Sequence, residues 1–217
     1  MNLSKQRANW RKGKNAFMLT LCGLATAIAI APLIWILAYV TKAGAPVLSL
    51  DFFTQLPTPV GVPGGGVINA IVGSAITVGL GLLFAAPVGV LAAFYVVYRP
   101  NTPLSLAMRF GIDVISGVPS IVMGIFAYTL VVLPQRHFSA FSGGVVLSFI
   151  MLPIIIRSTE EMLKLVPGTL REGSLALGAP EWKTSLSIVL PAAGNGVLTG
   201  LMLAISRAAG EAAPMLF

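Results

Sequence analysis

The chain has 217 residues, of which 56% are hydrophobic and only 10% are charged, and its mean hydropathy is +0.91. Soluble domains carry about 25% charged residues, so a chain this apolar could not cover its surface, and the composition excludes a soluble protein in favour of a polytopic membrane protein. The net charge of +7 does not indicate a nucleic-acid partner, because five of the fourteen basic residues lie in the first fourteen positions, just before an apolar run.

The apolar runs predict an all-α bundle of about five transmembrane helices. Residues 1–16 form a basic segment, and the first span, 17–40, is longer than a signal-peptide core of about 7–15 residues, so we expect it to be retained. The segment 41–67 is rich in proline and glycine and is expected outside, along the membrane interface. The remaining spans are predicted at 68–98, where Pro87 marks a kink site, at 110–133, at 143–156 with its flanks, and at 185–210.

Several residue types that often carry chemistry predict no site here. The glycines at 64–66 follow no predicted strand and belong to no GxxxxGK[ST] pattern, so they are interpreted as a flexible lead into the second span and not as an ATP-binding loop. Cys22, the single cysteine, is interpreted as a packing residue, and His137, the single histidine, as an ordinary loop residue. The sequence therefore predicts no catalytic group and no metal site.

The basic residues predict the orientation of the spans. With the N-terminus inside, eleven of them lie on the inner side and only Lys42 and Arg136 lie in outer loops. The positive-inside rule therefore favours an inside N-terminus for this multi-pass chain.

The polar segment 157–184 is predicted to lie in the cytoplasm and to form two or three short helices. Residues 158–161 and 169–172 both have the pattern of a capping box, and Pro167 with Gly168 separates them. Gly178 can supply the left-handed residue that ends the second helix, and Pro180 can start the next one. Such a loop is a candidate docking site for a cytoplasmic partner, and Glu172 is interpreted either as a cap or as a contact.

The spacing of residues between Glu172 and Pro191 resembles the EAA loop of type I ABC importer permeases. In that family the loop forms coupling helices that insert into a groove of a cytoplasmic ATPase. The chain departs from the family pattern at Gly173 and Ser174, where two alanines are usual, and Gly173 weakens a helix by roughly 1 kcal/mol relative to alanine. The resemblance implies that the following residues couple the chain to the ATPase: Glu172, Gly173, Ser174, Gly178, Ile188, Leu190 and Pro191.

Three further segments, 69–73, 117–122 and 207–214, resemble the phosphate-specific branch of this family, the PstA type, and the likeness covers about 67–217. Members typically have six spans, so the transmembrane domain 68–217 is expected to lack its last span. The resemblance implies a bacterial cytoplasmic (inner) membrane protein without a cofactor of its own. The implied partners are an ABC ATPase dimer that uses ATP and Mg, a sister permease, an external phosphate-binding protein and membrane lipid, with no nucleic acid.

Arg207 and Glu211 are four residues apart at the end of the last span and are predicted to share one helix face. Charges within a membrane are costly, and the arginine fork suits phosphate, so the resemblance favours Arg207 in the substrate path, with Glu211 orienting it or accepting a proton. The alternative is an ordinary ion pair at the outer interface. Arg109 and Asp113 have the same spacing and are interpreted as a structural pair at a helix start.

The predicted function is therefore the permease subunit of an ATP-driven inorganic phosphate importer, which works by alternating access and is not itself an enzyme. Three alternatives stay open: a permease for another solute such as a different oxyanion, a non-transporting membrane adaptor, and a passive channel.

Overall fold

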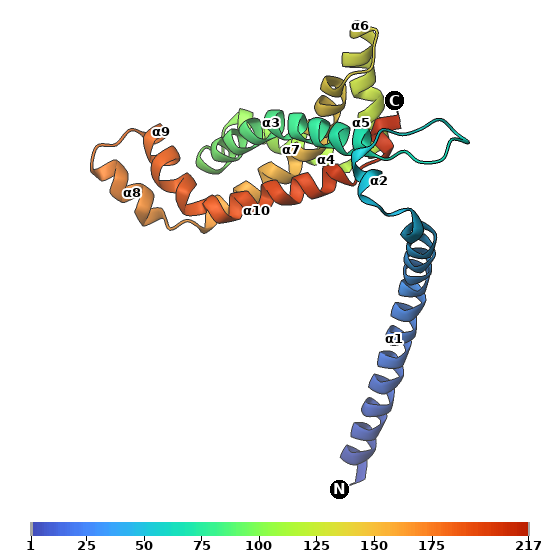
Figure 1. The fold of residues 1–217 in the computed structure, drawn as a ribbon. Coiled ribbons are helices and arrows are strands. Elements are labelled where there is room, and N and C mark those ends of the chain that lie inside the picture. Colours follow the sequence, from blue (N-terminus) through green and yellow to red (C-terminus); the bar gives the residue numbers. More distant parts are fainter. Residues whose placement is uncertain (1, 217) are drawn as a thin grey trace. The chain divides into compact units, whose positions relative to one another are not determined.

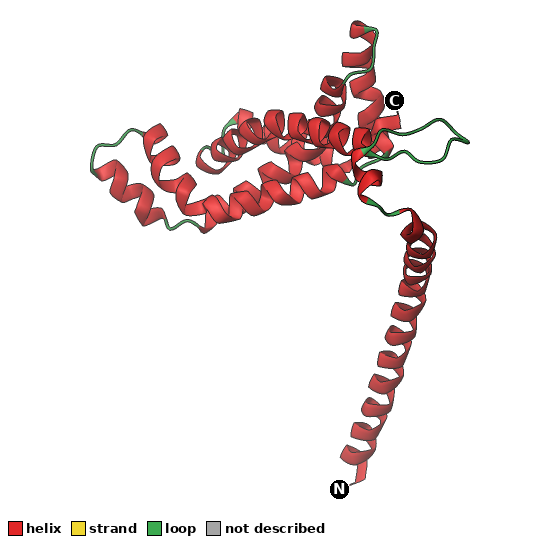
Figure 2. Cartoon of the chain, in the orientation of Figure 1, coloured by secondary structure: helices red, strands yellow, loops and turns green. Residues whose placement is uncertain are grey.

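The computed structural model describes residues 2–216, and the side chains of residues 10–215, as helices joined by loops, with no strand in that range (Figures 1 and 2). Four helices are long and apolar enough to cross a membrane, or five when one bent helix pair is counted as a span. These helices confirm the prediction of an all-α membrane bundle with about five spans. The chain forms two compact units, Met1–Ile68 and Asn69–Phe217.

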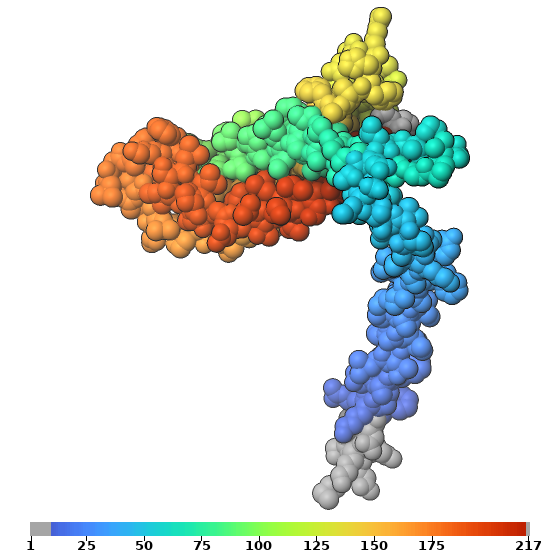
Figure 3. Space-filling view, in the orientation of Figure 1, coloured from blue at the N-terminus to red at the C-terminus, as the bar shows by residue number. Residues whose placement is uncertain are grey.

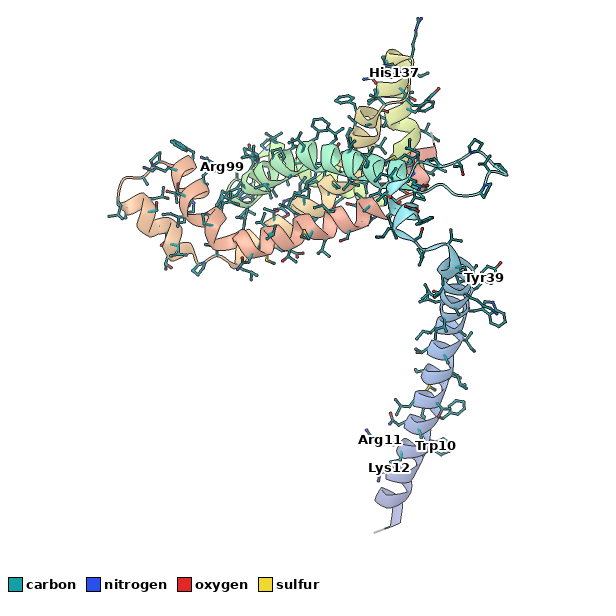
Figure 4. All side chains as sticks on the ribbon, in the orientation of Figure 1. Trp10, Arg11, Lys12, Tyr39, Arg99 and His137 are labelled. Carbon is teal, nitrogen blue, oxygen red and sulfur yellow. The ribbon has the colours of Figure 1, made fainter. Side chains whose placement is uncertain are left out.

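The first unit is dominated by α1 (Asn2–Gly44), a single helix that contains the predicted first span. The side chains of Lys5 and Arg7 lie outside the described residues, whereas Arg11 and Lys12 are exposed near the start of α1 (Figure 4). A 3-10 turn (Ala45–Val47) and the short helix α2 (Leu50–Thr54) follow, and the Ser49 hydroxyl caps α2 by accepting a hydrogen bond from the Phe52 N–H at 3.2 Å.

Gly65 and Gly66, before the second span, lie where another part of the backbone comes too close for a side chain. The Val67 N–H donates to the Phe52 carbonyl at 2.9 Å, and a Cβ on Gly66 would lie 2.4 Å from that same oxygen. Gly65 has a φ of +89°, a conformation that L side chains rarely adopt. These residues therefore form a defined turn, and their role is more specific than the flexible lead that the sequence predicts.

The second unit is built around α7 (Ala140–Leu165), which packs between two other long helices. On one side lies α3 (Ile68–Tyr98), which continues through Pro87, and on the other lies α10 (Leu190–Ala209). Glycines allow the close approach: a Cβ on Gly81 of α3 would lie 3.0 Å from the Leu147 Cβ, and one on Gly200 of α10 would lie 1.6 Å from the Ser158 hydroxyl oxygen. Residues of all three helices share one hydrophobic core.

The predicted third span, 110–133, is not one straight helix. The chain forms α4 (Pro103–Gly117) and then α5 (Ser120–Ala127), which continues through a π-helical segment (Tyr128–Val132) into α6 (Leu133–Gln135), and the two halves are bent by 108°. The cause is Pro119, whose ring excludes the helical conformation at Val118; that residue is extended, with a ψ of 132°.

Each of the two π-helical segments ends shortly before a proline. Tyr128–Val132 precedes Pro134, and Ser185–Val189 precedes Pro191. A proline in a helix lacks the N–H group and clashes with the carbonyl four residues earlier, which in both cases belongs to the π segment. The wider turn accommodates the ring, so the span Glu181–Ala209 stays continuous through α9 (Glu181–Thr184), the π segment and α10.

The polar segment begins later than the sequence predicts, because α7 continues to Leu165. The capping box at 158–161 is therefore wrong, since these residues lie inside α7. The box at 169–172 is wrong as well, because α8 (Gly168–Ala176) begins after Pro167 and has no side-chain cap. Gly178, with a φ of +82°, is left-handed as predicted, and α9 starts directly after Pro180. Helices α8 and α9 form one end of the second unit (Figures 1 and 3).

The glycine contact between α7 and α10 can be tested with a matched pair of substitutions. Gly200→Ala places a methyl group against Ser158, whereas a Cβ on Gly194 of the same helix meets nothing within 4 Å. Both changes gain the same helix propensity, so their difference isolates the packing. We expect Gly200→Ala to destabilise the protein by about 1–3 kcal/mol relative to Gly194→Ala, measured by thermal unfolding in detergent. Equal unfolding temperatures would contradict the close contact.

Candidate functional site

A cleft of about 200 Å³ lies where α4 stops and α5 begins. Two arginines line it from different helices, Arg157 from α7 and Arg207 from α10. Ser120, the first residue of α5, lies on the same cleft, so the positive end of that helix dipole adds to the arginines. The broken span thus brings together positively charged groups of a kind that can bind an anion. The complete lining is Ile115, Ser116, Val118, Ser120, Met123, Phe149, Ile150, Pro153, Ile154, Arg157 and Arg207.

Arg157 is held between two carboxylates. Its Nη2 donates a hydrogen bond to Asp113 on α4, and its Nη1 lies 3.8 Å from the Glu160 Oε2 one helical turn along α7. The Glu160 Oε2 accepts no hydrogen bond from the described residues. Arg157 therefore faces the cleft with its charge balanced and its position fixed by two helices.

Glu160 is the most deeply buried ionisable side chain in this cluster, with only 2% of its surface exposed. Its Oε1 lies 2.6 Å from the Arg109 Nη1 and 2.8 Å from the Lys164 Nζ. A buried carboxylate is tolerable only when cations pair with it, and Glu160 has such partners from α4 and from its own helix. The predicted pair of Arg109 with Asp113 is therefore wrong: each residue reaches across to α7, where the partner lies closer than along α4.

Arg207 and Glu211 are close together, but not on one helix. Helix α10 ends at Ala209, and Glu211 follows in a turn, where its Oε1 lies 3.7 Å from the Arg207 Nε. Glu211 lines a second cleft of about 600 Å³, together with hydroxyl side chains such as Ser74 and Thr77 of α3. The pair thus links the two clefts, with the cation on one and the carboxylate on the other.

The residues predicted to couple the chain to an ATPase divide into two groups. Glu172 and Gly173 are exposed on α8, and nothing lies within 4 Å of a Cβ placed on Gly173. Ser174 is buried and shares a hydrogen bond of 2.8 Å with the Thr184 hydroxyl, and Gly178 makes the turn after α8. The second group lies in the span itself and not in the loop: Ile188, Leu190 and Pro191.

Arg157 and Glu160 are the site residues that the sequence analysis missed. The predicted polar segment, 157–184, placed both residues in a cytoplasmic loop and not in the fourth span. Their spacing of three residues on a helix is the signal that could have found them, because it places two opposite charges on one face. In the part of the chain that the structure describes, no three His, Cys, Asp or Glu side chains are grouped so that they could hold a metal ion.

Comparisons with known proteins identify the family. Residues 85–217 match the model of the binding-protein-dependent transport system inner membrane component. The chain is 40% identical to the phosphate transport system permease protein PstA of Yersinia pestis, over all of this chain and 74% of that protein. It is 42% identical to the PstA protein of Haemophilus influenzae, over 97% of this chain and 75% of the relative. The chain belongs to this permease family, in its PstA branch.

A further relative has a somewhat lower identity. The PstA 1 protein of Mycobacterium tuberculosis is 37% identical over 95% of the chain and 68% of its own length. The relatives are permease subunits, so this chain is a helical transport component of the bacterial inner membrane and not a catalytic subunit. Both arginines of the cleft lie within the part of the PstA-type chain that matches the family model.

The buried carboxylate can be tested against its exposed neighbour. Glu160→Gln leaves three cations without their shared partner, whereas Glu161 is exposed and has no ion pair among the described residues. We expect Glu160→Gln to lower the free energy of unfolding by about 3 kcal/mol and Glu161→Gln to change it by less than about 0.5 kcal/mol. Thermal unfolding of the two purified variants measures the difference. A stable Glu160→Gln protein would show that the cluster is not a structural requirement.

Proposed function

We propose that this chain is the membrane-spanning permease subunit of an ATP-driven importer of inorganic phosphate. The observation that carries the proposal is the cleft between α4, α5, α7 and α10, with Arg157 and Arg207 on its wall. Arginine stays charged and offers two parallel donors to a phosphate oxygen pair. The relatives' names, phosphate transport system permease protein, support the same substrate.

The carboxylates beside the arginines suggest how an anion would pass. In the absence of substrate, Asp113 balances Arg157 and Glu211 balances Arg207. An entering phosphate would replace a carboxylate as the partner of an arginine, so the arginine would never be left unpaired in the membrane. Of the two contacts, the 3.7 Å pair of Arg207 with Glu211 is longer than a hydrogen bond and would open first.

The exposed face of α8 is the proposed contact with a cytoplasmic ATPase dimer that binds ATP and Mg. Its movement during ATP hydrolysis would expose the cleft alternately to the two sides of the membrane. A sister permease and an external phosphate-binding protein would complete the complex, with membrane lipid around the spans. The asymmetry of the basic residues supports an inside N-terminus and a cytoplasmic α8.

The cleft charge can be tested by replacing a guanidinium with an ammonium group. We expect Arg207→Lys to keep the charge but lose the bidentate geometry, and so to lower uptake at limiting phosphate by roughly tenfold. Arg136→Lys is the matched control, because Arg136 is exposed at the end of α6 and does not line the cleft. Uptake of radiolabelled phosphate and sulfate by cells with equal amounts of each protein is measured.

The outcomes separate the alternatives. Phosphate uptake that is unchanged in Arg207→Lys contradicts the role of the guanidinium. Uptake of sulfate but not phosphate by the unmodified protein would make the chain a permease for another oxyanion, and uptake of neither would favour the adaptor.

Glu172 can be tested as a contact alone, because α8 has no side-chain cap for it to support. We expect Glu172→Gln to assemble normally but to hydrolyse roughly two to five times more ATP for each phosphate transported, since a charged contact at an exposed surface is modest in energy. Lys183→Gln, which removes another exposed charge from the loop, serves as the control. The measurement is the ratio of ATP hydrolysed to phosphate transported in reconstituted complexes, and an unaltered ratio would leave Glu172 without a coupling role.

A further inference from the structure

Glu181, the first residue of α9, joins three helices through its two carboxylate oxygens. Its Oε2 lies 3.1 Å from the Nη2 of Arg99, which follows the end of α3. Its Oε1 lies 3.6 Å from the Nη2 of Arg171 on α8. Figure 4 labels Arg99 at this end of the second unit, near α8 and α9. One side chain therefore connects the loop helices to a membrane span that is distant in sequence.

A second contact fixes Arg171 in place for this role. Its guanidinium lies over the ring of Tyr98, the last residue of α3, with 4.9 Å between Cζ and the ring centroid. Arg171 is less exposed than the other two members of the cluster, at 30% of its side chain compared with about 60% for Arg99 and Glu181. Arg171 thus reaches the end of α3 both directly, through Tyr98, and through Glu181.

A buried hydrogen bond connects helices α8 and α9. The hydroxyls of Ser174 on α8 and Thr184 on α9 are 2.8 Å apart, and both side chains are buried. A buried bond of this kind holds more firmly than an exposed one. Through this bond, the contact of Glu181 with Arg99 connects α8 as well as α9 to the end of α3.

Helix α3 packs closely against α7, the helix that carries Arg157. A Cβ on Gly89 of α3 would lie 2.7 Å from the Cγ2 of Ile155 on α7. Earlier in α3, a Cβ on Gly81 would lie 3.0 Å from the Cβ of Leu147 on α7. Helices packed this closely shift together, because their side chains have no free space to absorb the movement. The helices of the two arginines are connected to the loop along the chain, since α7 leads into α8 through Val166 and Pro167, and α9 is continuous with α10 through the π segment. Helix α3 has no such direct connection to α8 and α9 in the sequence.

We propose that Glu181 is a positioning residue that makes α3 move together with the α8–α9 loop, so that the α3 wall of the second cleft, with Ser74 and Thr77, responds to the same loop movement as the two arginines. The inference rests on the proposed transport function. Without Glu181, a loop movement would still reach α7 and α10 along the chain, but α3 would follow it less closely.

The test compares Glu181→Gln with Glu161→Gln, which removes an exposed carboxylate without a described ion pair. Two readouts are taken on the complete reconstituted complex. One is the ratio of ATP hydrolysed to phosphate transported. The other is the distance distribution between spin labels on cysteines at Asn101, after α3, and Leu177, after α8, both exposed, with Cys22 replaced by serine.

We expect Glu181→Gln to broaden the distance distribution and to raise the ratio roughly two- to fivefold, the range that exposed ion pairs allow, while Glu161→Gln changes neither. Arg99→Gln should have the same effect, adding nothing to Glu181→Gln in the double variant, and Arg99→Lys should restore most of the coupling because it keeps the charge.

Other outcomes overturn the inference. A narrow distribution in Glu181→Gln would show that the loop is held by other contacts, whatever the ratio. A broad distribution with an unchanged ratio would make Glu181 a local tie without a part in coupling. If the unmodified complex transports no phosphate, the proposed function fails, while the distance distributions still report whether Glu181 ties the loop to α3.

Discussion

A carboxylate inside an apolar helix bundle must be surrounded by cations, and the arrangement of α4 and α7 depends on how Glu160 meets this requirement. Arg109 reaches it from α4, Lys164 from the next turn of α7, and Arg157 lies beside it. Because any of these helices would leave a buried charge unpaired by moving away, the cluster fixes their relative position. The same cluster holds Arg157 at the edge of the cleft, so the pairing of the buried Glu160 also determines where this arginine of the site lies.

In the second unit, glycine contacts allow the helices to pack closely, whereas ion pairs link particular side chains of neighbouring helices. The glycine contacts with α7 bring the helix backbones close: Gly81 and Gly89 of α3 face Leu147 and Ile155, and Gly200 of α10 faces Ser158. The ion pairs are concentrated toward the carboxyl-terminal half of α7 and the loop that follows. Apolar packing thus makes the bundle rigid, and the charges determine where it can respond to a partner or an anion.

Much of the architecture could be predicted from the sequence because it depends on local signals. The apolar runs predicted the helical class, and Gly178 predicted the end of α8, since both follow from single residues or short patterns. The break after α4 was missed although Pro119 predicts it, because residues 114–135 contain no charged side chain to interrupt the predicted span. The partners of Arg109 and Asp113 could not be predicted, because a spacing of four residues favours a pair on one helix and carries no information about the neighbouring α7.

The two arginines of the cleft differ in how firmly they are held, and this difference bears on the direction of transport in the proposed function. Arg157 has two carboxylate partners on two helices, one of them buried, so its guanidinium stays in place when an anion arrives. Arg207 is 60% exposed and has a single partner at 3.7 Å, beyond the end of its helix. A loosely held cation can exchange Glu211 for phosphate at small cost, whereas a fixed one provides a constant positive potential. The anion would therefore meet Arg207 first, from the larger cleft that Glu211 lines, and then pass to Arg157.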